Sequence, residues 1–312
     1  MKLSLIVPCY NEAENVAAFQ AAAISAFSDC GYDFELIFVD DGSKDATLHE
    51  LRKLYAQQLC PVKVISFSRN FGKESGIYAG MQHASGDYIS LIDADLQQRP
   101  EIVRDMVKIL EENPEYDIVA AYQDRRGEGK LLSFFKKSFY ALINRLSDVN
   151  LKSDASDFRT FRRSVAESLL KVSEYHRFSK GIFAWVGYNT CFIPYTANPR
   201  VAGESKWNFR KLFNYAVDGI IGYSTRPLRI ATFLGSFTAV VAFLYLIAVI
   251  LEKLITGIDI PGYATIIVLI LFLGSMQLFC IGIIGEYVGR TFEQSKDRPI
   301  YIAKEILNYE KK

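Results

Sequence analysis

The chain has 312 residues, enough for one large domain or two small ones with a substantial buried core. Half of the residues are hydrophobic and the mean hydropathy is slightly positive, at +0.09, which excludes disordered and fibrous classes. The five cysteines and three histidines are scattered, with no CxxC pair. This disfavours a zinc site or a disulfide framework and favours a reducing, cytosolic setting.

The formal net charge of +1 hides a strong asymmetry along the chain. Residues 1–124 carry 10 Lys and Arg against 20 Asp and Glu, a net charge of −10. Residues 125–226 carry 18 against 8, a net charge of +10, and residues 227–312 carry 8 against 7. An acidic part followed by a basic part indicates two functional surfaces of opposite charge.

The first 124 residues alternate short apolar runs with helical segments. Five runs rich in Val, Ile, Leu and Phe are predicted strands: Leu3–Pro8, Phe34–Asp40, Val62–Phe67, Tyr88–Asp93 and Ile118–Tyr122. The segments between them are predicted helices, near 12–28, 45–58, 73–84 and 100–112. This alternation predicts an α/β fold of Rossmann type, with a mostly parallel sheet covered by helices.

Two long stretches without charge lie towards the C-terminus. Ile230–Leu251 has 22 residues and Ile260–Gly285 has 26, and either can cross a hydrocarbon core of roughly 30 Å. The alternative is a pair of helices buried in a soluble core, but soluble helices seldom lack a polar face for this long. A two-helix transmembrane hairpin is therefore predicted.

Basic residues flank this hairpin on both sides. Arg226 and Arg229 precede it, and Arg290, Lys296 and Arg298 follow the second apolar stretch. The positive-inside rule therefore predicts that both termini are cytoplasmic. The expected organisation is two halves of a soluble domain, a juxtamembrane amphipathic helix, the hairpin and a cytoplasmic tail, at 1–124, 125–204, 205–229, 230–285 and 286–312.

Two segments ahead of the hairpin combine an apolar stripe with basic borders. The segment 209–221 directly precedes the hairpin and is predicted to lie in the cytoplasmic interface of the membrane. For the segment 131–146, an interfacial helix and an ordinary helix facing the core are equally compatible with the pattern.

Polar side chains gather at three predicted strand ends. They read PCYNE at residues 8–12, DDGS at 40–43 and DADLQ at 93–97. Capping turns can explain any one of these clusters, but three at strand ends indicate a site, because ligands bind at the carboxyl ends of strands in open α/β sheets.

The third cluster predicts a metal site. Asp93 and Asp95, followed by the amide of Gln97, offer hard oxygen ligands at a strand end. Such ligands suit Mg²⁺ or Mn²⁺, which keep positions open for substrate phosphate oxygens and can neutralise a leaving diphosphate. The sequence has no GxGxxG after the first strand and no GxxxxGK[ST], which weakens dinucleotide-binding and P-loop interpretations.

Together these motifs resemble a known family. IVPCYNE, FVDDGSKD, SRNFGKESG, GDYISLIDADLQ, SDFRTFRRSV and NPRVAGESKW, followed by two spans, resemble the family 2 glycosyltransferases. More narrowly they resemble the polyprenyl-phosphate glycosyltransferases, bacterial relatives of dolichyl-phosphate mannose synthase. The likeness runs from Leu3 to about Pro299 and implies a GT-A-type domain with a membrane anchor.

The resemblance also implies roles for individual residues. It implies a nucleotide-sugar site at Pro8, Tyr10, Asn11, Glu12, Asp40, Asp41, Lys73, Asp93, Ala94 and Asp95. It implies that Asp93, Asp95 and Gln97 hold Mg²⁺ or Mn²⁺. The implied product is a hexose joined to a lipid phosphate, formed with inversion at the anomeric carbon.

The basic part of the chain supplies candidates for the acceptor side. A polyprenyl phosphate is already an anion, so proximity and charge neutralisation matter more than a strong general base. Arg125, Arg200 and Lys206 are candidates for binding the diphosphate or the acceptor phosphate, and the loop around Arg200 resembles a mobile segment. Asp157 and Arg159 are the catalytic candidates, with a structural pairing of Asp157 to a neighbouring arginine as the alternative.

We therefore expect a metal-dependent hexosyltransferase of the bacterial inner membrane, with its catalytic domain in the cytoplasm. UDP-glucose is the favoured donor and undecaprenyl phosphate the favoured acceptor. The main alternative is an inactive membrane scaffold or flippase accessory with the same fold. A processive polysaccharide synthase is disfavoured because it would need a QxxRW motif and more spans. An oxidoreductase is disfavoured because the first turn lacks a glycine-rich fingerprint. No nucleic-acid partner is expected, whereas glycines in the spans are compatible with a homo-oligomer.

Overall fold

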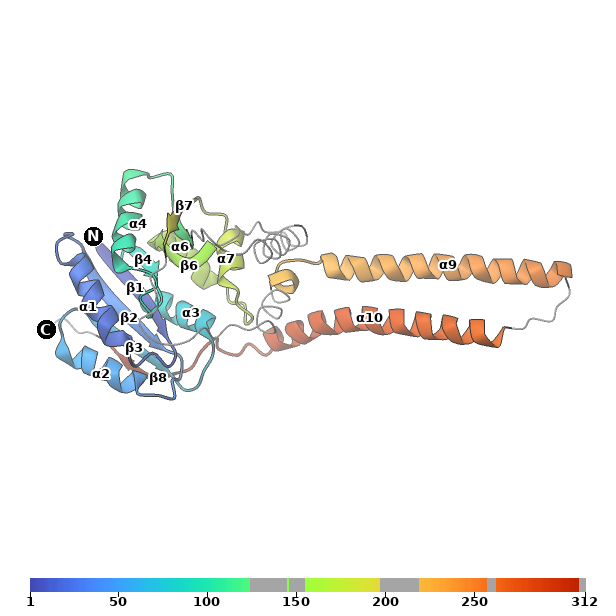
Figure 1. Ribbon diagram of the computed structural model, residues 1–312, viewed down its shortest axis with the longest axis horizontal. Helices are drawn as coiled ribbons and strands as arrows, with labels where there is room; N and C mark the ends of the chain where they lie inside the picture. Colours follow the sequence, from blue (N-terminus) through green and yellow to red (C-terminus); the bar gives the residue numbers. More distant parts are fainter. Residues whose placement is uncertain (124–144, 146–154, 197–218, 257–261, 309–312) are drawn as a thin grey trace.

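A single eight-stranded sheet organises the N-terminal domain (Figure 1). The computed structural model describes residues 1–123, 145, 155–196, 219–256 and 262–308. The strands are β1 (Lys2–Cys9), β2 (Asp33–Asp40), β3 (Val62–Phe67), β4 (Tyr88–Leu91), β5 (Ile118–Gln123), β6 (Ala155–Arg162), β7 (Thr190–Tyr195) and β8 (Ala303–Leu307). Their order across the sheet is β7-β5-β6-β4-β1-β2-β3-β8.

Helices cover both faces of this sheet. Those of the soluble domain are α1 (Val16–Phe27), α2 (Thr47–Gln57), α3 (Lys73–His83), α4 (Pro100–Glu112), α6 (Arg163–Lys171) and α7 (Ser179–Trp185). Helices α1, α2 and α4 contribute to one hydrophobic cluster, while α3, α6 and α7 contribute to another. Because the sheet is covered on both faces, the middle of β1 is fully buried and reads as a continuous apolar run.

The predicted α/β fold with a mostly parallel sheet is confirmed. Strand β1 pairs in parallel with β2 and β4, and β2 pairs in parallel with β3. All five predicted strands are present, although β4 ends at Leu91, two residues earlier than predicted. The carboxyl ends of β1 to β4 therefore lie along one edge of the sheet, which we call the carboxyl edge.

Strand β6 brings a later part of the chain to this carboxyl edge. It pairs antiparallel with β4, so that Leu91 lies opposite Arg159 and Tyr88 lies opposite Arg162. The end of β4 and the start of β6 consequently meet at the same place. Residues 155–157 thus join the loop that follows β4, although more than sixty positions separate them in the sequence.

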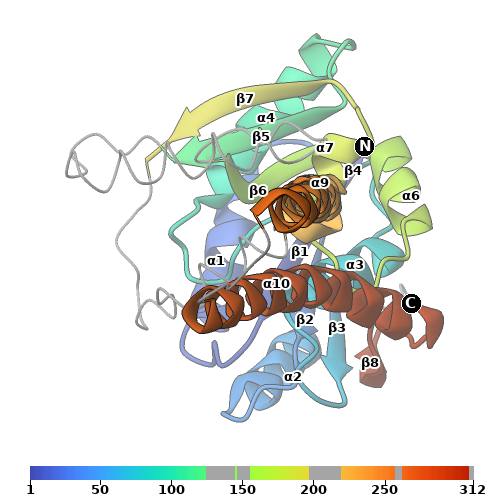
Figure 2. The same cartoon turned by 90° about the vertical axis from the view of Figure 1, so that its right-hand side faces the viewer.

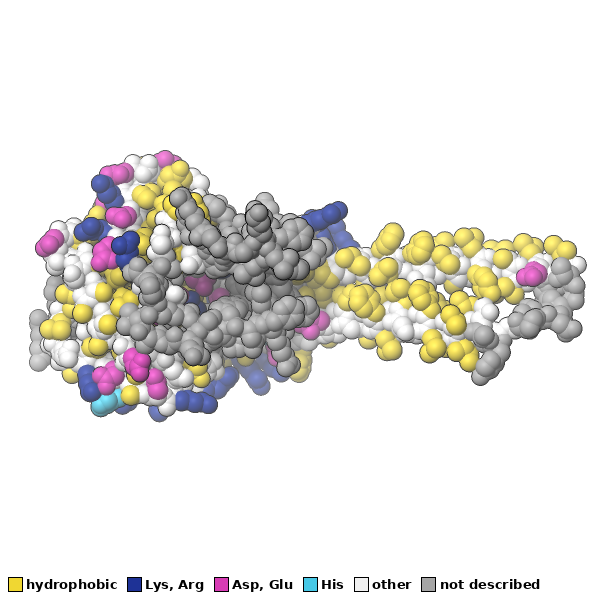
Figure 3. Space-filling view, viewed as in Figure 1, with side chains coloured by type: hydrophobic (Ala, Val, Ile, Leu, Met, Phe, Trp, Pro, Cys, Tyr) yellow, Lys and Arg dark blue, Asp and Glu magenta, His cyan; other side chains and the backbone are white. Residues whose placement is uncertain are grey.

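Two long helices, α9 (Arg226–Thr256) and α10 (Tyr263–Ser295), extend from the domain side by side (Figures 1 and 2). Segments of 27 and 31 residues within them are apolar enough to cross a membrane, and none of their most apolar windows is buried inside the protein. Hydrophobic side chains cover this hairpin, whereas charged side chains gather on the domain and at the hairpin's base (Figure 3). The predicted transmembrane hairpin is confirmed as a fold feature.

The helices are longer than the predicted apolar stretches. Helix α10 continues ten residues past Gly285, and Glu286 and Arg290 form an ion pair one turn apart within this extension. A helix can leave the hydrocarbon region and continue into water, since backbone hydrogen bonding continues independently of side-chain polarity. The extent of the uncharged stretch therefore predicts where the helix crosses the membrane, but not where the helix begins and ends.

The tail predicted for 286–312 contains the eighth strand of the sheet. Strand β8 pairs antiparallel with β3, with Ala303 opposite Phe67 and Leu307 opposite Val64. Ala303 follows the end of α10 after seven residues and lies at the carboxyl end of β3. The carboxyl edge of the sheet therefore faces the hairpin.

The two amphipathic segments predicted at 131–146 and 209–221 lie almost wholly outside the described residues. Only residue 145 and residues 219–221 of them are described, all in helical conformation. Whether these segments lie in a membrane interface stays a prediction.

Candidate functional site

The loop after β1 and the loop after β2 hold each other in place at the carboxyl edge. The amide of Asn11 donates to Ser43 Oγ at 3.0 Å, and the amide of Lys44 donates to Asn11 Oδ1 at 2.9 Å. The amide of Glu12 donates to Thr47 Oγ1 at 2.8 Å. Asn11 also adopts a positive φ of 55°, a conformation that asparagine tolerates better than most residues. The PCYNE and DDGS motifs thus form one substructure.

Asp40 and Asp41 are buried and hold the neighbouring loops. Asp40 accepts hydrogen bonds from Ser66 Oγ at 2.8 Å and from the amide of Ser43 at 3.0 Å. Asp41 accepts from the amides of Phe71 and Gly72, at 2.6 and 2.9 Å. Burial raises the pKa of Asp41, and the two amide bonds only partly offset this. The contact with base and ribose that the resemblance implies for this pair stays a prediction.

Gly42 has a backbone role that no other residue can fill. Its φ is +62°, and a Cβ built there would lie 2.4 Å from the carbonyl carbon of Arg69. The loops after β2 and β3 therefore approach each other backbone to backbone. This contact fixes the chain that leads into α3, where Lys73 and Glu74 form the first turn.

The loop after β4 is held by Gln98, a residue that the sequence motifs did not single out. The amide of Asp93 donates to Gln98 Oε1 at 3.0 Å, and Gln98 Nε2 donates to Asp93 Oδ2 at 3.3 Å. Gln98 Nε2 also lies 3.4 Å from Ser156 Oγ on β6. Asp95 Oδ1 accepts from the amide of Gln97 at 3.1 Å, which closes a local turn. Gln98 thus links the two chain segments that meet at this edge.

Lys73 bridges the two carboxylates that the antiparallel pairing of β4 and β6 brings together. Its Nζ lies 2.6 Å from Asp93 Oδ1 and 3.4 Å from Asp157 Oδ2. Burial alone would lower the pKa of Lys73, but the two carboxylates outweigh it and raise that pKa. Burial likewise opposes ionisation of Asp157, but the cations Lys73, Lys180 and Arg159 lower its pKa to about 2. Lys73 and Asp157 are therefore both charged at neutral pH.

Glu74, the neighbour of Lys73 in the chain, is a weaker acid than an ordinary glutamate. Burial and the nearby charge of Asp157 raise the pKa of Glu74 to about 7, despite hydrogen bonds that favour its ionised form. Its Oε2 accepts from the amide of Ser179 at 2.9 Å and from the Ser179 hydroxyl. Glu74 thereby ties the start of α3 to the start of α7.

The residues present fit a divalent ion that shares its ligands with a substrate. Asp93 and Asp95 offer carboxylate oxygens and Gln97 an amide oxygen on one short loop. Within the described part of the chain, no group of three or more His, Cys, Asp and Glu is placed to hold a metal by itself. Mg²⁺ and Mn²⁺ commonly use one or two carboxylates and complete their shells with water and phosphate. The donor set therefore fits a metal that arrives with a diphosphate.

The predicted site residues divide into two groups. Most lie at the carboxyl edge, on strand ends, on the loops that follow them, on β6 or at the start of α3: Pro8, Tyr10, Asn11, Glu12, Asp40, Asp41, Lys73, Asp93, Ala94, Asp95, Gln97, Asp157 and Arg159. Arg125, Arg200 and Lys206 lie outside the described residues. Gln98, Glu74 and Lys180 were missed. Glu74 lies inside the SRNFGKESG motif and Gln98 directly follows DADLQ, while Lys180 lies outside all of the motifs, and only the fold shows the contacts of the three residues.

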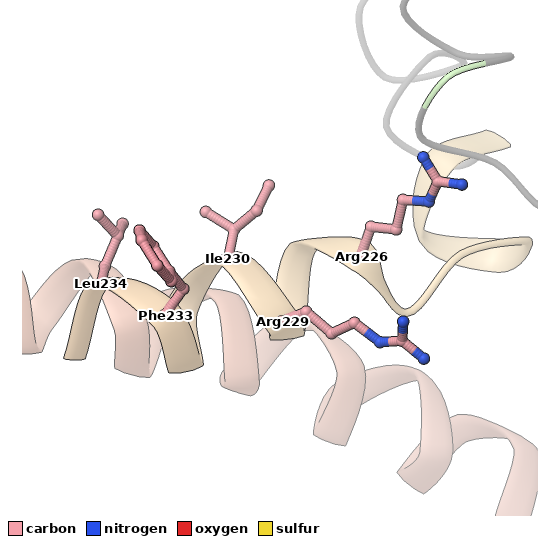
Figure 4. A pocket seen from close by; sticks show the side chains of 5 residues that line it. All are labelled: Arg226, Arg229, Ile230, Phe233 and Leu234. Atoms are coloured by element: carbon pink, nitrogen blue, oxygen red, sulfur yellow. The ribbon is translucent and has the colours of Figure 1, made fainter. Parts of the chain in front are cut away.

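A separate groove lies at the start of α9 (Figure 4). The guanidinium groups of Arg226 and Arg229 lie at one end, followed along the helix by three apolar side chains, those of Ile230, Phe233 and Leu234. Arg226 also donates to the carbonyl oxygen of Arg145. Two arginines next to an apolar helix face are typical of the boundary between the lipid chains and the cytoplasm.

Comparison with known families agrees with this fold. Residues 4–170 match the model of glycosyl transferase family 2, and residues 226–291 match the GtrB C-terminal hairpin. The chain therefore belongs to glycosyl transferase family 2 and has a GT-A-like α/β domain followed by a membrane-type hairpin.

Two relatives that are similar over nearly the whole chain are named as bactoprenol glucosyl transferases. The prophage bactoprenol glucosyl transferase homolog of Escherichia coli (strain K12) is 39% identical over 306 residues, 98% of this chain and 99% of that protein. The bactoprenol glucosyl transferase of Shigella phage SfV is 40% identical over 304 residues, 97% and 98% of the two chains. Among solved structures, mannosyl-3-phosphoglycerate synthase from Rubrobacter xylanophilus is 17% identical with a TM-score of 0.49, covering 73% and 74%. The likeness to both bactoprenol proteins covers nearly the whole chain, hairpin included.

Proposed function

We propose that this protein transfers glucose from UDP-glucose to undecaprenyl phosphate at the cytoplasmic face of the bacterial inner membrane. The observation that carries the proposal is the meeting of Asp93, Lys73 and Asp157 at the edge of the sheet that faces the hairpin. Relatives that are about 40% identical over almost the full chain and are named bactoprenol glucosyl transferases support glucose and a polyprenyl lipid.

The reaction needs little acid–base chemistry from the protein. An oxygen of the acceptor phosphate forms a bond to the anomeric carbon while the bond from that carbon to the β-phosphate of UDP breaks. The electron pair leaves with UDP, and attack from the opposite face inverts the anomeric configuration. A metal ion at Asp93 and Asp95, when bound, neutralises charge on the departing diphosphate.

The chain's own residues have to align two anions. In this proposal the PCYNE and DDGS loops bind the nucleotide, while Asp157 and Arg159 on β6 position the acceptor phosphate next to the anomeric carbon. Lys73 keeps Asp157 ionised and links it to the donor side. Holding two reactants in one orientation accounts for a large part of enzymatic acceleration in such bimolecular reactions.

The decisive measurement is transfer of labelled glucose from UDP-glucose to undecaprenyl phosphate by the full chain in detergent. We expect lipid-linked glucose, loss of activity in EDTA and recovery with Mg²⁺ or Mn²⁺. Turnover that persists in EDTA would contradict the role of the metal but not the transfer. Nuclear magnetic resonance of the product tests inversion, since the α-glucose of the donor should become β-linked.

An inactive scaffold with the same fold is the alternative. Calorimetric titration with UDP-glucose separates the two, because the proposed enzyme must bind it and Asp93→Asn must weaken binding in the presence of metal. The exposed Asp105 on α4 supplies the matched control, Asp105→Asn. A folded protein that binds no sugar nucleotide and makes no lipid product would favour the scaffold.

A further inference from the structure

Lys180 lies next to the proposed reaction centre although no motif in the sequence points to it. It is the second residue of α7, directly after Ser179, whose amide donates to Glu74 Oε2 at 2.9 Å. Glu74 follows Lys73 in the first turn of α3. The start of α7 is therefore tied to the helix that carries the bridging lysine of the site.

Arg159 fixes α7 from the other side. Its guanidinium carbon lies 4.1 Å from the centre of the Phe183 ring, a cation–π contact, and its Nη2 donates to the carbonyl oxygen of Ser156 at 2.9 Å. Phe183 and Lys180 are three residues apart on α7 and hence on the same side of the helix. The side of α7 that carries Lys180 consequently faces the start of β6, where Asp157 lies.

Positive charge exceeds negative charge around Asp157. Burial lowers the pKa of Lys180; Asp157 opposes this, while the neighbouring cations Arg159 and Lys73 lower that pKa further. Among the residues that the structure describes, the carboxylates of Asp93 and Asp157 and the weakly acidic Glu74 face these three cations, and Asp93 is already paired with Lys73. An additional anion would balance the cluster.

The position of α7 indicates which anion this is. The ring of Tyr223, three residues before α9, packs so closely on α7 that a Cβ at Gly181 would lie 2.4 Å from its Cε2. The same ring lies 6.0 Å from the ring of Phe178. Helix α7 thus lies between the reaction centre and the start of the hairpin, the side from which a lipid-borne acceptor would reach the site.

We propose that Lys180 and Arg159 form a subsite for the phosphate monoester of the acceptor lipid, beside Asp157. This inference rests on the proposed function and adds the residue that recognises the acceptor. A partly desolvated ammonium interacts with a phosphate more strongly than one in water does, and charge-assisted hydrogen bonds to phosphate are among the strongest available. Lys180 is a binding residue for the acceptor, whereas the donor site does not include it.

A binding experiment tests the subsite without requiring turnover. Farnesyl phosphate is titrated calorimetrically into the full chain in detergent, with farnesol as the neutral analogue and inorganic phosphate as the free anion. For Lys180→Gln we expect farnesyl phosphate to bind about tenfold more weakly and farnesol to bind unchanged. Lys171→Gln, at the exposed end of α6, is the matched control and should change nothing.

Kinetics then separates recognition of the acceptor from a structural role. In Lys180→Gln we expect the KM for undecaprenyl phosphate to rise about tenfold, the KM for UDP-glucose to change less than twofold, and Lys180→Arg to recover most of the loss. Equal binding of farnesyl phosphate by wild type and Lys180→Gln would overturn the subsite. Parallel loss of farnesol binding would also overturn it, because it would indicate a change in packing.

The two proposals fail in different ways. A wild type that binds farnesyl phosphate through Lys180 but transfers no glucose would contradict the proposed function and leave the phosphate subsite supported. A wild type that transfers glucose normally, with an unchanged lipid KM in Lys180→Gln, would contradict only the subsite. Tight binding of inorganic phosphate at the same place, with no gain from the farnesyl chain, would assign the subsite to a free anion and overturn the lipid assignment.

Discussion

At the residue scale, Lys73 lies 2.6 Å from Asp93 Oδ1 and 3.4 Å from Asp157 Oδ2, and so connects two carboxylates with different proposed tasks. The motif resemblance implied a place for Lys73 in the nucleotide site. The structure places it between the loop after β4 and the start of β6, and its contact with a nucleotide stays a prediction. Its charge explains how Asp157 remains ionised with limited access to water. Removing any one member of such a cluster leaves the others with an uncompensated charge.

Asp157→Asn tests this cluster directly. The amide keeps the shape but removes the charge that balances Lys73, Arg159 and Lys180, so we expect kcat to fall at least about 100-fold. Glucose transfer to undecaprenyl phosphate measures the effect, and circular dichroism verifies folding. Asp105→Asn on the exposed side of α4 should keep normal turnover. Near-normal turnover of a folded Asp157→Asn protein would remove this residue from the mechanism.

A second charged cluster, around Glu35, contributes to stability. Glu35 is only 2% exposed on β2, and its carboxylate accepts from Ser4 Oγ at 2.6 Å and from the amide of Ser85 at 2.7 Å. Lys63 Nζ lies 3.2 Å away. Burial by itself would raise the pKa of Glu35, but these hydrogen bonds and Lys63 lower it to about 2. Glu35 is thus a buried acid that is stable only in its ionised form.

The lowered pKa predicts a pH dependence of stability. A carboxylate whose pKa is lower in the folded than in the unfolded state stabilises the fold fully above its ordinary pKa of 4.5. That contribution is lost as the pH falls from 4.5 towards 2. We expect Glu35→Gln to cost roughly 3 kcal/mol at pH 7, and its deficit relative to wild type to shrink across this window.

Thermal unfolding at several pH values, followed by circular dichroism, checks this expectation. Glu101→Gln, at an exposed position in the first turn of α4, is the control and should track wild type closely. A deficit for Glu35→Gln that stays constant from pH 7 to pH 2.5 would contradict the assignment of the acid-sensitive stability to Glu35.

At the scale of elements, β8 returns the chain to the sheet after the hairpin. It covers the edge of β3 and adds side-chain contacts. Glu305 on β8 pairs with Arg52 at 2.5 Å, and the ring of Tyr301, just before β8, stacks on that of Phe67 with 4.8 Å between the ring centres. The Tyr301 hydroxyl also donates to Gln82 Oε1 at 2.8 Å. Both ends of the hairpin are therefore joined to the domain, which restricts its orientation relative to the carboxyl edge.

Tyr301 provides a test of this attachment. Tyr301→Ala removes the stacked ring and should lower the unfolding free energy by about 2 kcal/mol, while Tyr301→Phe keeps the ring and should cost about 1 kcal/mol or less. Thermal unfolding of the two variants in detergent compares them. Equal losses in both would assign the effect to the hydroxyl rather than to packing against β3.

At the scale of the whole molecule, the opposite charges of the two chain parts meet at one edge of the sheet. The acidic part supplies Asp93 and Asp95 there, and the basic part supplies Arg159 and Lys180. The hairpin lies next to that same edge, with Arg226 and Arg229 where α9 begins. Membrane anchoring and charge distribution thus both favour a reaction between a soluble anion and a lipid-borne anion.

The proposed cytoplasmic orientation can be tested in intact bacteria. Ile255→Cys near the tip of the hairpin, where the side chain is 80% exposed, should react with a membrane-impermeant maleimide added outside spheroplasts. Lys304→Cys on β8 should react only after the membrane is permeabilised. The wild type, with its five native cysteines, provides the background. The reverse labelling pattern would contradict the positive-inside assignment.

The local pattern of the sequence was sufficient for the elements of the first 124 residues and for the polar motifs at their strand ends. Apolar runs and helix starts placed all five N-terminal strands, since burial on both faces imposes a continuous apolar run on each. The two long stretches without charged residues predicted the positions of the two long helices. The DADLQ segment was recognisable because two carboxylates and an amide lie within five consecutive residues.

Contacts between distant segments were decided only by the tertiary structure. Asp157 reaches Lys73 because β6 runs antiparallel to β4, and β8 closes the sheet after a membrane hairpin. Lys180 gained a proposed role only through the packing of α7. The sequence by itself therefore determined the fold class, the membrane hairpin and the polar motifs at the strand ends, since these depend on local periodicity and composition. The acceptor side depended on strand pairing between segments far apart in the chain, which local patterns do not encode.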